Sequence, residues 1–218
     1  MTTATPRRLG SAGEADLWCL DLRVSEADLA SLARSLAEPE RERAARLARP
    51  ELWRRYVAAR AGLRELLGGY LAVPPDSLRF AEGPHGKPAL AGGPFFSVSH
   101  SGELALYAVS TSRDLGVDVE EVRPVPGAGG IARKWFSAGE MEAYRRAGGD
   151  GSDSAFLLIW TRREAYLKAI GTGLLGLGSR EEIDPELWET HELRPAEGYL
   201  GALVVARAPV SRAGRHPG

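Results

Sequence analysis

The sequence is poor in cysteine, in lysine and in long hydrophobic runs. Its 218 residues contain a single cysteine, Cys19, so the chain cannot form an internal disulfide or a thiolate metal cage. Twenty-eight basic and twenty-nine acidic residues leave a formal charge of −1, which gives no general attraction to nucleic acid or to a membrane surface. No run of about eighteen apolar residues occurs, and none follows Arg7 and Arg8 near the start. We therefore expect a cytoplasmic protein without a signal peptide or a membrane span.

The rest of the composition is that of a folded domain. The chain is 44% hydrophobic and 26% charged, enough to bury one core or two small ones that share an interface. Residues 1–14 and 208–218 are rich in small, polar, Pro and Gly residues, so we expect them to be loose ends. Between them, the sequence predicts an N-terminal half over 15–112 and a C-terminal half over 113–207.

Helix and strand signals alternate within these halves. Capping boxes at Ser25–Asp28 and Ser137–Glu140 each predict the start of a helix. The other expected elements are strands over Leu17–Leu22, Phe95–Ser99, Leu104–Ser110 and Leu115–Glu120, and helices after Pro50 and over Phe156–Ile170. A weak match of Arg60–Arg64 with Glu164–Lys168 suggests two similar α+β halves, a pseudo-dimer, that meet across a cleft.

Two acidic residues, Asp118 and Glu120, lie two positions apart in an expected strand. Their carboxylates therefore project from one face, while Leu115, Val117 and Val119 project from the other. Two neighbouring anions favour a bound cation. Spacing alone favours a strand whose polar face is solvated.

Trp160, Glu164 and Lys168 are spaced by four residues in the second long helix, so they lie along one stripe. A Glu-to-Lys ion pair of about 0.3–0.5 kcal/mol beside a packed tryptophan would explain that spacing. The chain uses lysine only three times against twenty-five arginines, however, so a retained lysine suggests a chemical role.

Three segments could bind phosphate. Lys87 lies in the glycine-containing turn His85–Pro88, and Ser99–Gly102 offers hydroxyls and an imidazole at a strand end. Arg41–Arg64 carries eight arginines against two acids, a local charge of +6. A surface turn, a structural histidine and a solvated helix face are the corresponding structural interpretations.

The order of these motifs resembles that of the surfactin-type 4'-phosphopantetheinyl transferases. The resemblance runs from about Asp16 to Leu174 and is carried by five segments: Gly86–Pro88, Phe96–Gly102, Gly116–Glu120, Phe136–Glu140 and Trp160–Leu174. It implies a pseudo-dimer with the active site between its halves. It also implies transfer of 4'-phosphopantetheine from coenzyme A to a serine of an acyl or peptidyl carrier protein, with release of adenosine 3',5'-bisphosphate.

The resemblance also implies the roles of individual residues. Asp118, Glu120 and Glu164 would hold Mg²⁺ on the pyrophosphate of coenzyme A. Glu164 and Lys168 would be catalytic, Glu164 as a base for the serine and Lys168 as a partner of the leaving phosphate. The residues expected to bind coenzyme A are Arg41, Arg49, Gly86, Lys87, Ser99 and His100. Arg163 stands where the family often has lysine.

We expect a monomeric enzyme, since the pseudo-dimer supplies both sides of the cleft, with no nucleic-acid or membrane partner. Two alternatives remain open from the sequence. One is a binding module for coenzyme A or nucleic acid that uses the Arg41–Arg64 cluster, with structural carboxylates. The other is a Mg²⁺-dependent pyrophosphate hydrolase with water as the nucleophile. Neither the carrier protein nor the pathway can be predicted from the sequence.

Overall fold

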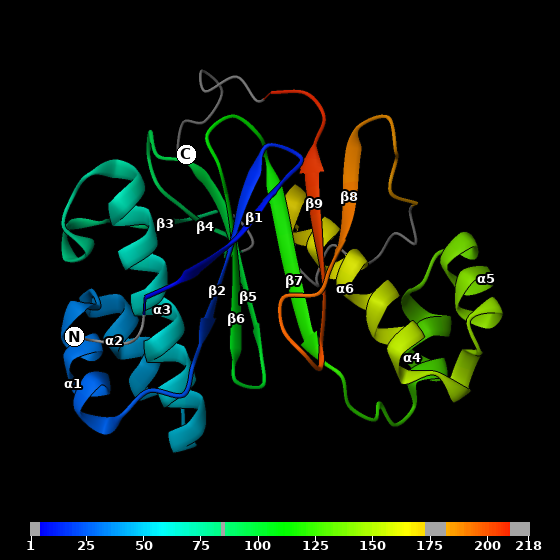
Figure 1. Ribbon diagram of the computed structural model, residues 1–218, viewed down its shortest axis with the longest axis horizontal. Coiled ribbons are helices and arrows are strands. Elements are labelled where there is room, and N and C mark those ends of the chain that lie inside the picture. Colours follow the sequence, from blue (N-terminus) through cyan, green and yellow to red (C-terminus); the bar gives the residue numbers. More distant parts are fainter. Residues whose placement is uncertain (1–4, 84–85, 173–181, 210–218) are drawn as a thin grey trace.

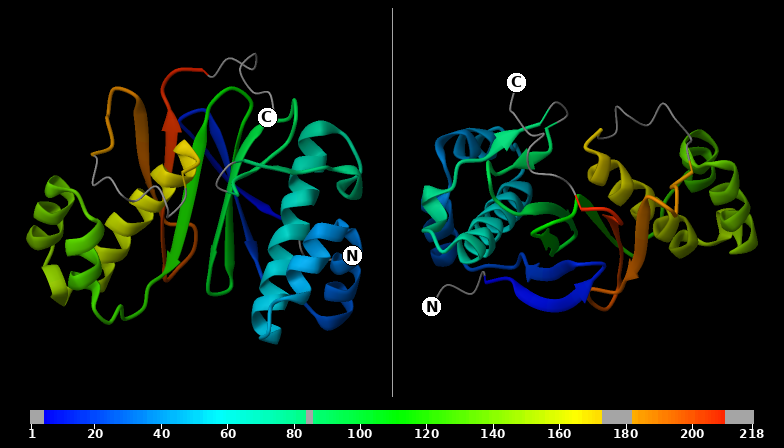
Figure 2. Two further views of the ribbon diagram at one scale, coloured as in Figure 1. Left: turned by 180° about the vertical axis from the view of Figure 1, so that it is seen from behind. Right: turned by 90° about the horizontal axis from the view of Figure 1, so that it is seen from above.

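The computed structural model describes residues 5–83, 86–172 and 182–209. Within these ranges, two antiparallel sheets lie side by side between two groups of helices (Figures 1 and 2). The predicted combination of helices and antiparallel strands is confirmed.

The first sheet has four strands in the order β1-β2-β6-β5, each antiparallel to its neighbour. Its strands are β1 (Arg7–Ala12), β2 (Ala15–Asp21), β5 (Phe95–Ser101) and β6 (Leu104–Ser110). A separate two-stranded sheet is formed by β3 (Ala81–Glu82) and β4 (Pro88–Ala89). The three strands predicted in this half match β2, β5 and β6 to within two residues at each end.

The prediction of a loose end over residues 1–14 is wrong for Arg7–Ala12, which form β1. Arg7–Ala12 pairs with β2 and covers what would otherwise be an exposed sheet edge. The register shifts between Arg8 and Gly10, so the strand has no regular polar and apolar alternation that a sequence reading could detect. Of the tail expected over 208–218, residues 210–218 lie outside the described residues.

The second sheet has three strands in the order β7-β9-β8. They are β7 (Leu115–Glu121), β8 (Trp188–Leu193) and β9 (Tyr199–Ala206). The predicted strand at Leu115–Glu120 is confirmed, but it pairs with β9 rather than with the strands that precede it in sequence. The apolar run of β9 is the sequence signal for this central strand, and no motif had drawn attention to it.

Three helices accompany each sheet. The first group comprises α1 (Glu26–Ser35), α2 (Glu38–Ala45) and α3 (Pro50–Leu71), and the second comprises α4 (Ala128–Trp135), α5 (Ala138–Arg146) and α6 (Asp153–Ile170). Short 3-10 turns occur at Pro75–Ser77 and Gly149–Gly151. Both predicted capping boxes begin helices: the hydroxyls of Ser25 and Ser137 accept the N–H groups of Asp28 and Glu140. None of the helices among the described residues has the length and apolar character needed to cross a membrane.

The core is layered because β6 is buried on both faces. Tyr107 and Val109 pack toward α3, whereas Leu106 and Ala108 pack toward the second sheet. Val117 from β7 joins this shared core, so apolar side chains of both sheets form one cluster. The alternation of β7 then turns its polar residues toward α6.

Candidate active site

The acidic residues of β7 come together with Glu164 of α6 because a glycine permits close packing. A Cβ atom at Gly116 would lie 2.0 Å from the carbonyl oxygen of Ala165 and 2.4 Å from the backbone nitrogen of Ala169. The α6 backbone therefore lies directly against β7 at this point. This close approach brings Glu164 and Lys168 to the Asp118 side of the strand.

Asp118 is 5% exposed, and its two carboxylate oxygens differ in their contacts. Oδ1 accepts a hydrogen bond from Ser99 Oγ at 2.7 Å and an ion-paired hydrogen bond from Lys168 Nζ at 2.7 Å. Oδ2 is buried and has no hydrogen-bond partner among the described residues. One oxygen of a buried carboxylate is thus left for a ligand.

Glu164 on α6 also has a buried carboxylate oxygen. Its Oε1 is buried and has no hydrogen-bond partner within the described ranges. Burial and then the negative charge of Asp118 raise the pKa of Glu164 to about 7, against a lowering contribution from Lys168. Burial also raises the pKa of Glu120, and the hydroxyl of Ser101 and the charge of Arg123 partly oppose this.

The cluster therefore carries more negative charge than its neighbours neutralise. Lys168 pairs with Asp118, and Arg123 lies 3.6 Å from Glu120. In the part of the chain that the structure describes, no three His, Cys, Asp or Glu side chains are already arranged to hold a metal ion. The arrangement offers two orphaned carboxylate oxygens rather than a closed cage.

His100 follows Ser99 on β5 and adds an imidazole beside this cluster. One side of the residue is open to solvent. Desolvation on its protein side lowers the pKa of the imidazole, and the positive charges of Lys168 and Arg55 lower it further. A neutral imidazole among cations and carboxylates suits an anionic ligand that brings its own charge.

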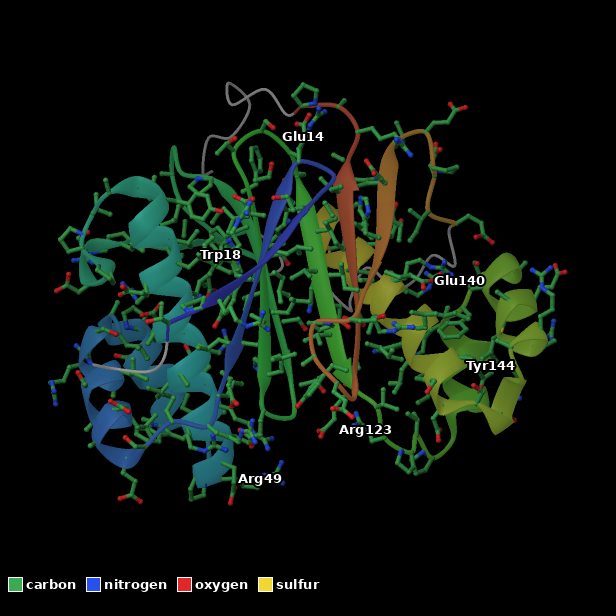
Figure 3. The ribbon with its side chains drawn as sticks, in the orientation of Figure 1. Glu14, Trp18, Arg49, Arg123, Glu140 and Tyr144 are labelled. Atoms are coloured by element: carbon green, nitrogen blue, oxygen red, sulfur yellow. The ribbon has the colours of Figure 1, made fainter. Side chains whose placement is uncertain are left out.

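The predicted phosphate-binding residues lie in several places. Arg41 on α2 is ion-paired with Glu38 at 2.5 Å, and Arg49 is the exposed residue before α3. Figure 3 shows Arg49 at the lower end of the view, where Arg123 also lies. Gly86 has a positive φ of 78°, and Lys87 donates to the carbonyl oxygens of Leu115 at 3.0 Å and Ala169 at 3.1 Å. Lys87 thus joins the start of β7 to the end of α6.

The +6 segment is not a free cationic face. Six of its eight arginines have carboxylate partners: Arg41, Arg46, Arg54, Arg55, Arg60 and Arg64. Most of these carboxylates, including Glu40 and Glu103, lie outside the segment, so a charge count within it missed them. The sequence interpretation of an arginine cluster without acidic partners is wrong for this reason.

Two sets of contacts near this cluster could not be predicted from the sequence. Arg54 and Arg55 both donate to Glu103 Oε1, at 2.8 Å and 2.6 Å, which fixes Arg55 near His100. The guanidinium of Arg163 donates a hydrogen bond to the carboxylate of Glu140 in α5, at 2.5 Å. Arg163 therefore makes a buried contact with α5.

Comparison with known proteins agrees with the geometry. Residues 114–203 match the family described as the 4'-phosphopantetheinyl transferase superfamily. The chain is 36% identical over 211 residues to the 4'-phosphopantetheinyl transferase HetI of Nostoc sp., and the match covers 88% of each protein. It is 26% identical over 206 residues to the 4'-phosphopantetheinyl transferase ffp of Bacillus subtilis, covering 86% of this chain and 90% of that protein. The chain therefore belongs to the 4'-phosphopantetheinyl transferase superfamily.

Proposed function

We propose that this protein transfers the 4'-phosphopantetheine group of coenzyme A to a serine of an acyl or peptidyl carrier protein and releases adenosine 3',5'-bisphosphate. The observation that carries the proposal is the under-neutralised cluster of Asp118, Glu120 and Glu164 beside Lys168, in a chain of this superfamily. Phosphoryl transfer depends mainly on positioning and on charge stabilisation, which this cluster is equipped to supply.

The residues present fit Mg²⁺. Asp118 Oδ2 and Glu164 Oε1 are buried oxygens without a partner among the residues that the structure describes, and oxygen is the donor that Mg²⁺ prefers. Mg²⁺ usually takes one or two carboxylates and completes its shell with water and substrate phosphate, so a closed protein cage is not required. Asp118, Glu120 and Glu164 would hold it. When bound, it would neutralise the charge that develops on the pyrophosphate of coenzyme A.

Glu164 and Lys168 have distinct positions for proton handling. Glu164 Oε1 has no hydrogen-bond partner among the described residues. If it does not bind the metal, it can accept the proton of the attacking serine, either directly or through a water. Lys168 is held by Asp118 with its ammonium group at the cluster, where it can stabilise or protonate the departing phosphate. For Glu164, the role of base is the alternative to a purely metal-binding role.

We assign the phosphates of coenzyme A to six residues that lie on different elements. They are Arg41, Arg49, Gly86, Lys87, Ser99 and His100. Ser99 carries a restriction: a hydroxyl has one proton, and Ser99 donates it to Asp118. A phosphate oxygen only accepts, so Ser99 can bind it only after releasing Asp118. Lys87 likewise commits two contacts to backbone carbonyls.

We further propose that the site is a cleft between two related halves, 15–112 and 113–207, in a monomeric cytoplasmic enzyme. The support is the origin of the residues: Ser99 and His100 come from the first sheet, whereas Asp118 and Glu164 come from the second sheet and its helix. Light scattering after size-exclusion chromatography tests the monomer, which a dimer mass of the active fraction would rule out.

The deciding experiment is the intact mass of apo carrier proteins after incubation with this protein, coenzyme A and Mg²⁺. Covalent transfer adds one phosphopantetheine, about 340 Da from its formula, to the carrier serine. Glu164→Gln is the control and is expected to leave the carrier mass unchanged. Coenzyme A cleavage at the same rate without any carrier would instead identify a pyrophosphate hydrolase.

The nucleic-acid module is disfavoured by one observation. Six of the eight arginines from Arg41 to Arg64 are already paired with carboxylates of this chain, which weakens the field that a polyanion would meet. Retention on heparin that is insensitive to coenzyme A and survives Asp118→Ala would favour that module over the transferase.

A further inference from the structure

Three serines link the two sheets where their edges meet. β5 and β7 belong to different sheets, and Ser97, Ser99 and Ser101 alternate along β5 on the side facing β7. Ser97 Oγ accepts the N–H of Val117 at 3.1 Å. The other two hydroxyls each contact a carboxylate of β7. Side chains thus make contacts that main-chain pairing makes elsewhere in a sheet.

The two carboxylate contacts have the same form. Ser99 Oγ donates to Asp118 Oδ1 at 2.7 Å, and Ser101 Oγ donates to Glu120 Oε2 at 2.7 Å. Ser101 Oγ also accepts the N–H of Glu121 at 3.2 Å, which fixes the direction of its proton. Each hydroxyl therefore occupies one oxygen of its carboxylate. For Asp118, the other oxygen is the buried one without a partner.

We propose that Ser99 and Ser101 are positioning residues that orient the Asp118 and Glu120 carboxylates for a divalent cation, and that Ser97 only joins the sheets. Ser99 is 8% exposed and Ser97 is 6% exposed, so both lie in the same buried environment. They differ in what they touch: a carboxylate for Ser99, a backbone N–H for Ser97. Groups that fix the orientation of a metal ligand change metal affinity when removed.

The contact also couples the halves. Asp118 belongs to the second sheet, yet the hydroxyl that orients it belongs to the first. Lys168 approaches the same oxygen, Oδ1, from α6. Among the described residues, removing the Ser99 hydroxyl leaves Lys168 as the remaining side-chain partner of Asp118 and frees the carboxylate to rotate toward Lys168. The expected result is a weaker cation site without loss of the fold.

The experiment measures binding of Mn²⁺ by electron paramagnetic resonance in the full-length protein, with and without coenzyme A. Ser99→Ala is expected to weaken Mn²⁺ binding by about tenfold or more, as loss of an orienting partner does at other metal sites. Ser101→Ala is expected to act in the same direction. Ser97→Ala, the matched control on the same strand, is expected to leave Mn²⁺ affinity unchanged while lowering the unfolding temperature. Ser99→Thr keeps the hydroxyl and is expected to restore most of the binding.

Kinetics give a second readout. In the Mg²⁺ titration of carrier modification, Ser99→Ala is expected to raise the Mg²⁺ concentration needed for half-maximal rate and to leave KM for the carrier unchanged. Equal weakening of Mn²⁺ binding in Ser97→Ala and Ser99→Ala, unaltered binding in Ser99→Ala, or no Mn²⁺ binding by the unsubstituted protein would each overturn the inference.

This inference rests on the proposed function only in that a divalent cation binds at these carboxylates. Normal Mn²⁺ binding that depends on Ser99, together with no mass gain on any carrier, would contradict the transferase and leave the positioning role intact.

Discussion

Each of the two helix groups contains a buried glutamate near the start of a short helix, and the two glutamates have the same kinds of hydrogen-bond partner. Glu40 in α2 accepts the N–H of Ala37 and guanidinium groups of Arg60 and Arg64 from α3. Glu140 in α5 accepts the N–H of Ser137 and the guanidinium of Arg163 from α6. Both glutamates are 6% exposed. Glutamate–arginine ion pairs thus join α2 to α3 and α5 to α6.

Of the carboxylates at β7 and α6, Asp118 is buried and Glu120 and Glu164 are half-buried, and none of them has an arginine matched to it in this way. Within the described ranges, Asp118 and Glu164 each keep an oxygen without a partner, and Lys168 pairs with the other oxygen of Asp118. Burial of a charge is costly unless it is paired. The contrast indicates that the arginine-paired acids stabilise the fold, and it supports the proposal that the acids with an unpaired oxygen bind a ligand.

The largest expected effect comes from neutralising an unmatched acid. Glu164→Gln should reduce transfer to the carrier by about 10²–10⁴, because a base or metal ligand is lost. Its unfolding temperature should stay the same or rise, since burial and the charge of Asp118 already disfavour the ionised form of Glu164. Calorimetry in EDTA together with single-turnover assays measures both. A clear drop in unfolding temperature would break the comparison.

Removing the arginine partner of Glu140 or Glu40 should instead lower the stability of the fold. Arg163→Met leaves Glu140 buried without its guanidinium and should cost about 3–5 kcal/mol of unfolding free energy. Urea denaturation measures it. The double variant with Glu140→Gln should recover most of that loss, because no buried charge remains. Arg64→Met should cost less, since Glu40 retains Arg60; a larger loss there would contradict the pairing argument.

A smaller effect is expected at the contact that carries α6. Gly116→Ala places a methyl group against the α6 backbone, so the helix must shift, at a cost of about 1–3 kcal/mol. A shift on the order of 1 Å can lower the transfer rate about a hundredfold, because Glu164 and Lys168 move away from Asp118. Gly69→Ala in α3 is the control, since a Cβ there meets nothing within 4 Å. Equal rates in the two variants would disprove a positioning role for Gly116.

The smallest expected effect is the contribution of Glu40 to the pH dependence of stability. Burial raises the pKa of Glu40, but hydrogen bonds from Arg64, Arg60 and Ala37 outweigh it, so the folded pKa lies below its ordinary value. Its ionised form therefore stabilises the fold above the unfolded pKa, and this contribution is lost as pH falls through the folded pKa. Denaturation at a series of pH values should show a shallower acid decline in Glu40→Gln. An identical decline in both proteins would refute the assignment.

The sequence predicted what depends on local pattern. The capping boxes at Ser25 and Ser137, the strand that carries Asp118 and the helix that carries Glu164 follow from spacing and side-chain type. The clustering of Asp118 with Glu164 came from family resemblance, because the two residues lie 46 positions apart in the sequence, too far for any local pattern to connect them.

What the sequence did not reveal depends on distant partners. Arg60 and Arg64 looked like part of a cationic face because Glu40 lies outside the helix that they share. The direction of the Ser99 proton is set by Asp118, which faces it only after two sheet edges meet. β1 was missed since an edge strand is selected by its neighbour more than by its own composition.

The pairing of β7 has a consequence for synthesis of the chain. β7 hydrogen-bonds to β9, where Leu115 faces Val205 and Glu121 faces Tyr199, so its ladder partner is made about eighty residues later. A chain emerging from the ribosome in order can fold the first sheet early, because β1, β2, β5 and β6 are all complete by Ser110. The strand bearing Asp118 and Glu120 must wait for β9. Nascent or prematurely terminated chains would thus lack an assembled carboxylate cluster.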